Sequence, residues 1–127
     1  MSIPIPDDRR YTDGHLWLMK NADGSLDIGA TEEGQAQLGD MVYVELPEVG
    51  KAFTPRAAVA TLESVKAASD MLVPVTGKVL ATNAALKDRP ELVNSEPYSS
   101  WVVRVKIDRI DEAGLMSAEQ YRKLIGA

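Results

Sequence analysis

Short runs of alternating apolar and polar residues recur along the chain, and this period of two is typical of β-strands. In the clearest run, residues 101–107, apolar positions share one face and basic positions the other: Trp101, Val103, Val105 and Ile107 against Arg104 and Lys106. Further strands are predicted where apolar or β-branched runs meet turn residues: 15–20 and 25–30 around the turn Asn21–Gly24, then 41–46, 56–62, 71–77 and 78–81.

Helical signals are few and short. Thr31 followed by Glu32 and Glu33 resembles a helix start, with room for one or two turns before Gly39. Residues 83–93 are predicted to be a loop with helical turns, interrupted by Pro90. A capping box at 117–120 opens a helix expected to end near Gly126. The pattern predicts a mainly β fold, a small β-sandwich or flattened barrel with short peripheral helices and a C-terminal helix.

Composition narrows the possible functions. A chain of 127 residues is long enough for one domain with its own core, and its net charge of −5 disfavours binding to nucleic acid. The absence of cysteine excludes disulfides, thiolate nucleophiles and cysteine metal sites, and a single histidine excludes a histidine-rich metal site. We expect that histidine, His15 beside Trp17, to be a packed or surface side chain rather than a catalytic base.

The N-terminal residues "MSIPIPDDRR" lack the basic head and apolar block of a secretory signal. No apolar run approaches the roughly 18 residues of a membrane helix. We therefore expect a cytoplasmic protein, or one of the mitochondrial matrix if a leader has been removed.

The segment "LESVKAASD", residues 62–70, lies between two predicted strands but contains none of the usual turn residues at its centre. Its apolar spacing and Ala67–Ala68 are compatible with a short helix. A hairpin with its tip at Val65–Lys66 would instead pair Ser64 with Ala67 and Glu63 with Ala68, and the residues alone leave both interpretations open. In the hairpin, Lys66 would project from the tip as a solvated charge or as a site for acylation.

Four fragments in the same order resolve this choice: "LGDMVYVELPEVGK", "ESVKAASD", "PVTGKV" and "PELVNSEPY". Together they closely resemble the H protein family of the glycine cleavage system. The similarity covers residues 11–107, and the tail helix "AEQYRKLI" is also similar. The resemblance implies one lipoyl-carrier domain over residues 1–127, with a lipoyl/biotinyl-domain-like β-sandwich as its core at about 11–107 and the C-terminal helix at about 117–125.

What the resemblance implies is a carrier and not an enzyme, with no catalytic residues and no metal. Lipoic acid would be attached to Lys66 in amide linkage at the hairpin tip. Glu63, Ser64, Val65, Ala67 and Asp70 would serve recognition around this attachment site. Biotin carriers share the architecture but usually flank their lysine with methionines, whereas Val65 and Ala67 flank Lys66.

The implied partners are four. A pyridoxal-phosphate-dependent glycine decarboxylase would load an aminomethyl group, a tetrahydrofolate-dependent aminomethyltransferase would remove it, a flavin dihydrolipoyl dehydrogenase would reoxidise the arm, and a lipoyl ligase or transferase would attach it. Because the redox sulfurs belong to the cofactor, a chain without cysteine fits this role.

Three stretches of the chain, at 14–16, 29–35 and 97–101, depart from the family pattern. Leu16 stands in "HLW" where the family usually has a glutamate that lines the cleft sheltering the loaded arm, and Gly14 stands where some members have a hydroxyl. The segment 29–35 is altered, and "PYSSW" at 97–101 is one residue short. We expect these changes to cluster at the cleft rim, with Asp70 retained in the cleft. They leave a second hypothesis, an H-like lipoyl carrier that serves another lipoate-dependent system or relays lipoyl groups.

Overall fold

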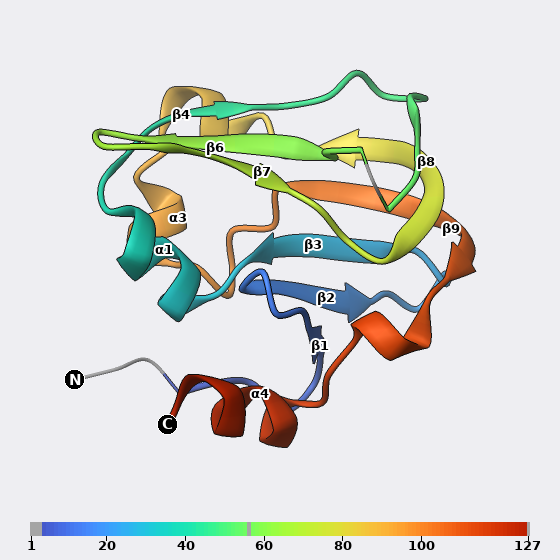
Figure 1. The fold of residues 1–127 in the computed structure, drawn as a ribbon. Helices are drawn as coiled ribbons and strands as arrows, with labels where there is room; N and C mark the ends of the chain where they lie inside the picture. The colour runs from blue at the N-terminus through green and yellow to red at the C-terminus, as the bar shows by residue number, and fades with distance from the viewer. Residues whose placement is uncertain (1–3, 56, 127) are drawn as a thin grey trace.

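Two antiparallel β-sheets form the body of the protein in the computed structural model, which describes residues 4–55 and 57–126. The predicted β-sandwich with short peripheral helices is confirmed (Figure 1). In strand order, the six-stranded sheet contains β1 (Arg10–Tyr11), β2 (Leu16–Lys20), β3 (Leu26–Ala30), β9 (Val103–Ile110), β8 (Val75–Thr82) and β5 (Ala52–Phe53). The three-stranded sheet contains β4 (Met41–Glu45), β6 (Ala60–Ser64) and β7 (Ala68–Met71).

Strand alternation divides the apolar side chains between two clusters. Leu16 and Leu18 of β2 enter the main core between the sheets, together with Val44 and Leu62 from the three-stranded sheet. Trp17 points to the opposite face of β2 and packs in a second cluster with Tyr11, Ala118 and Tyr121. The C-terminal helix therefore covers the outer face of the six-stranded sheet, on the side away from the three-stranded sheet (Figure 1).

Two strand predictions are corrected. The predicted break between 71–77 and 78–81 is wrong, because β8 runs unbroken from Val75 to Thr82. Gly77 lies inside it, where a Cβ would stand 1.9 Å from the Lys106 carbonyl oxygen; this glycine marks a close backbone approach at a register shift and not a strand end. The last strand begins at Val103, so Trp101 precedes it, and the Arg104 guanidinium stacks 4.8 Å from the centre of the Trp101 ring instead of lying on the opposite face.

Two helices begin at the positions predicted from their capping residues. Thr31 caps α1 (Glu32–Leu38) by accepting from the Gly34 N–H, and Ser117 with Gln120 forms the complete capping box of α4 (Ala118–Ile125). The 83–93 region contains α2 (Ala85–Asp88), and Pro90 separates it from α3 (Leu92–Ser95). A 3₁₀ turn, η1 (Glu112–Gly114), follows β9. No helix in the described part of the chain is long and apolar enough to cross a membrane.

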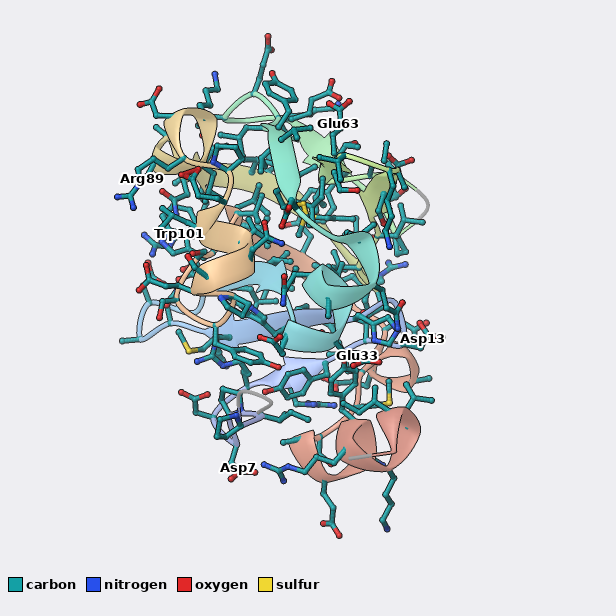
Figure 2. All side chains as sticks on the ribbon, turned by 90° about the vertical axis from the view of Figure 1, so that its left-hand side faces the viewer. Asp7, Asp13, Glu33, Glu63, Arg89 and Trp101 are labelled. Carbon is teal, nitrogen blue, oxygen red and sulfur yellow. The ribbon has the colours of Figure 1, made fainter. Side chains whose placement is uncertain are left out.

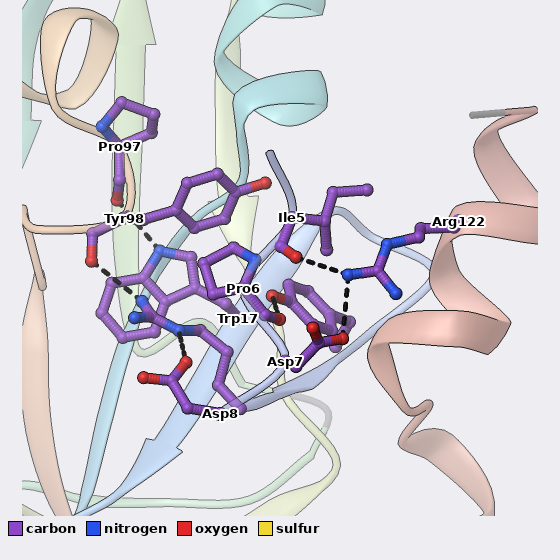
Figure 3. A network of polar contacts seen from close by, with 10 residues as sticks. Ile5, Pro6, Asp7, Asp8, Trp17, Pro97, Tyr98 and Arg122 are labelled. Carbon is purple, nitrogen blue, oxygen red and sulfur yellow. Dashed lines mark hydrogen bonds and ion pairs between the residues drawn. The ribbon is translucent and has the colours of Figure 1, made fainter. Parts of the chain in front are cut away.

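Arg9 and Arg122 hold the N-terminal segment against the rest of the molecule (Figure 3). The Arg9 guanidinium donates to the Tyr98 carbonyl at 2.8 Å and lies 4.6 Å from the centre of the Trp17 ring. Arg122 of α4 donates to the Ile5 carbonyl at 2.7 Å and to the Asp7 carboxylate at 2.8 Å. These contacts bring the two ends of the described chain together beside α4.

Candidate functional site

The segment 62–70 is a β-hairpin, so the predicted hairpin is confirmed and the helical alternative is wrong. Thr61 pairs with Asp70, Leu62 with Ser69 and Glu63 with Ala68, which is the register expected for a tip at Val65–Lys66. The Ser64 N–H donates to the Ala67 carbonyl at 2.8 Å and closes the last rung. In Figure 1 the tip projects from the same end of the sandwich at which α1 lies.

The side chain of Ser64 makes the hydrogen bonds that close this turn in the absence of the usual turn residues. Its hydroxyl oxygen accepts from the backbone N–H groups of Lys66 at 3.3 Å and Ala67 at 3.1 Å, and its proton can go to the Ala67 carbonyl at 3.1 Å. A side-chain oxygen that satisfies backbone donors two and three residues ahead replaces the bonds of a conventional turn. Val65 and Lys66 can therefore occupy the tip without a glycine or asparagine, and neither adopts a positive φ.

A second anchor connects the tip to the loop after α1. The Val65 N–H donates to the Asp40 carbonyl at 3.0 Å. The loop itself is held by Asn94 of α3, whose amide oxygen accepts from the Met41 N–H at 2.8 Å while its amide nitrogen donates to the Gly39 carbonyl and the Gln35 side chain. All hydrogen-bonding groups of the Asn94 amide near this loop are thus in use, and the tip is fixed to a rigid support.

Lys66 is exposed, and its ammonium makes no ion pair within residues 4–55 and 57–126. Its Cε lies 3.5 Å from where a Cβ on Gly39 would stand. Gly39 has a φ of 87°, which favours glycine, and the absence of a side chain there leaves room for the lysine stem. The amine is therefore free to react while its stem lies against the C-terminal end of α1.

A pocket of about 200 Å³ lies between α1 and β7, next to the hairpin. We call it the α1–β7 pocket; its lining consists of Gly14, His15, Leu16, Ala30, Gly34, Gln37, Leu38, Leu62, Ser69, Asp70 and Met71. The inner wall is apolar, and the polar side chains come from α1, from β7 and from the turn before β2. Larger hollows of about 440 and 560 Å³ lie at the N-terminal segment and at the β4–β5 connection, away from the tip.

The positions that depart from the family pattern fall in two places. Gly14, Leu16, Ala30 and Gly34 line the α1–β7 pocket, and Leu16 is buried with only 5% of its surface exposed. The segment 97–101 does not line it, so the expectation that all these changes cluster at its rim is corrected. The Pro97 carbonyl instead accepts from the Trp17 indole at 3.0 Å, on the other face of the six-stranded sheet (Figure 3).

The other predicted recognition residues surround the tip. Val65 is 69% exposed, Ala67 is exposed, and Glu63 is half-buried on the strand that leads into the turn. Asp70 is exposed and accepts from the Thr61 hydroxyl at 2.9 Å. Figure 2 looks at this end of the molecule, with Glu63 on the three-stranded sheet and Asp13 and Glu33 below it.

A polar chain behind the pocket has no counterpart in the sequence prediction. The Tyr121 hydroxyl of α4 lies 2.8 Å from Nδ1 of His15 and 2.7 Å from the Thr31 hydroxyl. Burial raises the pKa of Tyr121 to about 12, so the phenol keeps its proton at neutral pH. His15 is thus half-buried and bonded, as expected for a packed side chain, but its ring also forms part of the pocket wall.

An exposed lysine at the tip of a tight hairpin on a two-sheet β-sandwich defines a lipoyl-domain-like protein. Comparison with known proteins gives the family: the family model described as "Glycine cleavage H-protein" matches residues 9–127. The chain belongs to the glycine cleavage H-protein family, whose members are the lipoyl carriers of the glycine cleavage system.

Individual relatives agree along nearly the whole chain. A glycine cleavage system H protein of Paraburkholderia xenovorans is 44% identical over 131 residues, covering 98% of this chain and all of the relative. One from Methylacidiphilum infernorum is 46% identical over 123 residues, covering 95% of both. The crystal structure of a glycine cleavage system H protein from Mycobacterium marinum has a TM-score of 0.87 at 33% identity, covering 97% of this chain and all of the other.

Proposed function

We propose that Lys66 is the attachment site for lipoic acid and that the lipoylated chain carries an aminomethyl group from glycine between the enzymes of the glycine cleavage system. The observation that carries this proposal is the placement of Lys66. It is exposed at a tip whose backbone is fixed by Ser64 and Asp40, and it lies beside a pocket of suitable character. A rigid tip presents one amine in one geometry to a modifying enzyme.

The residues of the α1–β7 pocket fit a lipoyl arm. Leu16, Leu38, Leu62 and Met71 offer an apolar wall for a hydrocarbon chain and a sulfur ring, while Asp70 and His15 offer polar contacts for a charged end. The Lys66 stem already lies along Gly39, directly after the α1 residues that form the pocket wall. An arm on Lys66 would therefore start at one border of the pocket.

A lipoyl group on Lys66 would supply the chemistry: a disulfide able to take up the aminomethyl carbon of decarboxylated glycine, and a dithiol that a flavin enzyme could reoxidise after the cargo has been passed to tetrahydrofolate. The chain itself supplies no reacting group. Its role is to present the arm, to shelter the cargo from water in the pocket and to be recognised by the decarboxylase, the aminomethyltransferase, the dihydrolipoyl dehydrogenase and the lipoyl ligase.

Charge near the tip supports recognition by basic partner surfaces. Glu45, Glu63 and Asp70 lie on the three-stranded sheet that carries Lys66, and the whole chain has a net charge of −5. Opposite charge steers partners toward such a surface and raises the rate of association. We assign Glu63, Val65, Ala67 and Asp70 to this recognition surface, and Ser64 to the turn that supports it. The matched relatives are bacterial proteins, which supports a cytoplasmic place of work.

Intact mass spectrometry tests the attachment site. Protein expressed with lipoate and a lipoyl ligase is expected to gain the mass of one lipoyl group, and Lys66→Arg is expected to abolish this gain while keeping the charge. Lys78→Arg, at another exposed lysine on β8, is the matched control and should gain the same mass. A lipoylated Lys66→Arg variant would contradict the assignment.

Loading the lipoylated protein with glycine and the decarboxylase tests the cargo. Leu16 removes a carboxylate that the family usually places in the pocket, and this difference favours the alternative carrier that serves another lipoate-dependent system. A stable mass gain of one aminomethyl group supports the glycine cleavage role. An arm that is lipoylated but loads no aminomethyl group, or loses it as fast as free lipoamide does, supports the alternative.

A further inference from the structure

His15 is held in an unusual backbone conformation at the edge of the α1–β7 pocket. Its φ is 63°, and no other non-glycine residue in the described part of the chain has a positive φ. Such a conformation is strained and persists only where the surroundings enforce it, most often at functional sites. Glycine adopts it most easily, and asparagine, aspartate and histidine adopt it more often than other residues.

Several contacts enforce this conformation. The His15 N–H donates to the Thr12 carbonyl at 3.1 Å, and the His15 carbonyl accepts from the Thr31 N–H at 3.0 Å. Gly34 approaches so closely that a Cβ there would stand 2.8 Å from the His15 carbonyl oxygen. The backbone of His15 is therefore held by the turn before it, by the residue that caps α1 and by the close approach of Gly34.

The C-terminal helix fixes the ring of His15. Tyr121 contacts Nδ1 through its hydroxyl, and its own ring is stacked on Tyr11 with 4.8 Å between the ring centres and 8° between the planes. The other ring nitrogen, Nε2, points toward Gln37, whose amide nitrogen is 3.5 Å away and which also lines the pocket. Nδ1 is thus hydrogen-bonded to Tyr121 on the side of α4, while Nε2 faces Gln37 and the pocket.

The hydroxyls behind His15 allow either ring nitrogen to carry the proton. If Thr31 donates to Tyr121 and Tyr121 donates to Nδ1, each hydroxyl proton is used and the ring hydrogen is on Nε2. If Nδ1 carries the hydrogen, it donates to Tyr121, Tyr121 donates to Thr31, and Nε2 presents a lone pair to the pocket. The Gln37 amide nitrogen beside Nε2 is itself a donor, so it favours the second arrangement, in which Nε2 is an acceptor.

We propose that His15 binds the amino group of the aminomethyl cargo through Nε2 in the α1–β7 pocket, and that Tyr121 of α4 positions the ring for this contact. The proposal rests on the proposed function, because it needs a loaded arm on Lys66. An ammonium group has donors only, so it requires acceptors. Asp70 provides the one carboxylate among the pocket-lining residues, and His15 with its lone pair provides a second acceptor. This assigns to His15 part of the role that a carboxylate at position 16 would otherwise play.

Nitrogen NMR of the imidazole tests the proposal directly. The chain has a single histidine, so its two ring nitrogens are identified without further assignment. In lipoylated, unloaded protein we expect the hydrogen on Nδ1, because the Gln37 amide nitrogen can only donate to Nε2. After loading with glycine and decarboxylase, confirmed by intact mass, we expect the Nε2 signal to shift as the amino group of the cargo becomes its donor. An imidazole spectrum that does not change when the arm is loaded overturns the proposal while leaving the proposed function intact.

Variants separate binding from folding. His15→Asn tolerates the positive φ but removes the imidazole, and Tyr121→Phe keeps the stacking on Tyr11 but removes the hydroxyl. For both we expect formaldehyde and ammonia to be released from the loaded arm roughly two- to tenfold faster, the range for one lost hydrogen bond, with unchanged lipoylation of Lys66. Asp13→Asn, an exposed neighbour outside the pocket lining, is the matched control and should release at the wild-type rate (Figure 2).

The outcomes are distinct. Release at the wild-type rate from both variants overturns the proposal for His15 and Tyr121. A wild-type protein that is lipoylated but never loads overturns this proposal together with the glycine cleavage role. Faster release from the two variants, together with a change in the imidazole spectrum when the wild type and the Asp13→Asn control are loaded, supports it.

Discussion

The side chain of Lys66 lies against Gly39: the methylene next to the lysine amine is 3.5 Å from the position that a Cβ would occupy on Gly39. Gly39 follows α1 and Lys66 is at the tip of the β6–β7 hairpin, so the two residues are far apart along the chain. The hydrogen bond from the Val65 N–H to the Asp40 carbonyl, at 3.0 Å, brings them together. The modification site is therefore a joint product of the hairpin and of the loop that ends α1.

The first prediction concerns this contact. Gly39→Ala is expected to destabilise the protein by about 1–3 kcal/mol, because φ 87° with ψ −163° is a backbone region that essentially only glycine adopts. It should also slow lipoylation several-fold, because relief of that strain displaces Asp40 and the tip bonded to it. Gly24→Ala is the matched control: its φ is 91° and nothing lies within 4 Å of its Cβ position, so it should lose similar stability and keep the normal lipoylation rate. Equal lipoylation rates in the two variants would contradict the prediction.

Ser64 gives the second prediction. Ser64→Ala removes the acceptor for the N–H groups of Lys66 and Ala67, so both amides should exchange with deuterium markedly faster. The free energy of unfolding should fall by about 0.5–1.5 kcal/mol, as for a typical hydrogen-bonding group. Ser64→Asn, whose side chain can accept from the same donors, should restore much of the protection. Unchanged exchange in Ser64→Ala would show that the hydroxyl does not hold the turn.

Asn94 gives the third prediction. Asn94→Asp keeps the acceptor for the Met41 N–H but loses both donors, and it places a negative charge against the Gly39 carbonyl. We expect a loss of about 1–3 kcal/mol in urea unfolding, since partly buried groups lose their partners. We also expect slower lipoylation, because the support of the hairpin tip is loosened. Ser95→Ala at the exposed neighbouring position should do neither, and a stable Asn94→Asp with normal lipoylation would be at odds with this role.

Alkaline pH gives the fourth prediction. Burial raises the pKa of Tyr121 to about 12 and also raises the pKa of Tyr11 and Tyr98 above the ordinary value near 10. The unfolded chain therefore loses these protons at lower pH than the folded one. Their contribution to stability is complete below about pH 10 and is lost as the pH rises toward 12.

Thermal unfolding at a series of alkaline pH values measures this effect. The decline in stability of the wild type above pH 10 should be less steep in Tyr121→Phe, which has one such phenol fewer. Identical slopes would exclude Tyr121 as a contributor.

The sequence predicted the hairpin register, the sandwich, both capped helices and the position of Lys66, because these follow from local pattern or from resemblance. It did not predict how the turn is made, since Ser64 acts through its own side chain and serine is not diagnostic of a reversal. It could not predict the His15–Tyr121 contact, because these residues are 106 positions apart along the chain and meet only when α4 packs on the sheet. The break predicted at Gly77 was wrong because the glycine accommodates a neighbouring strand, a requirement visible only in three dimensions.

The ends of the described chain meet beside α4, where Arg122 bonds to Ile5 and Asp7 (Figure 3). The hairpin with Lys66 belongs to the other sheet, so the thickness of the sandwich separates the two (Figure 1). A C-terminal tag would therefore attach the protein to a surface on the side of the sandwich away from Lys66. The arm would stay accessible on a surface coated in this way, which suits direct measurement of how each partner enzyme binds and leaves.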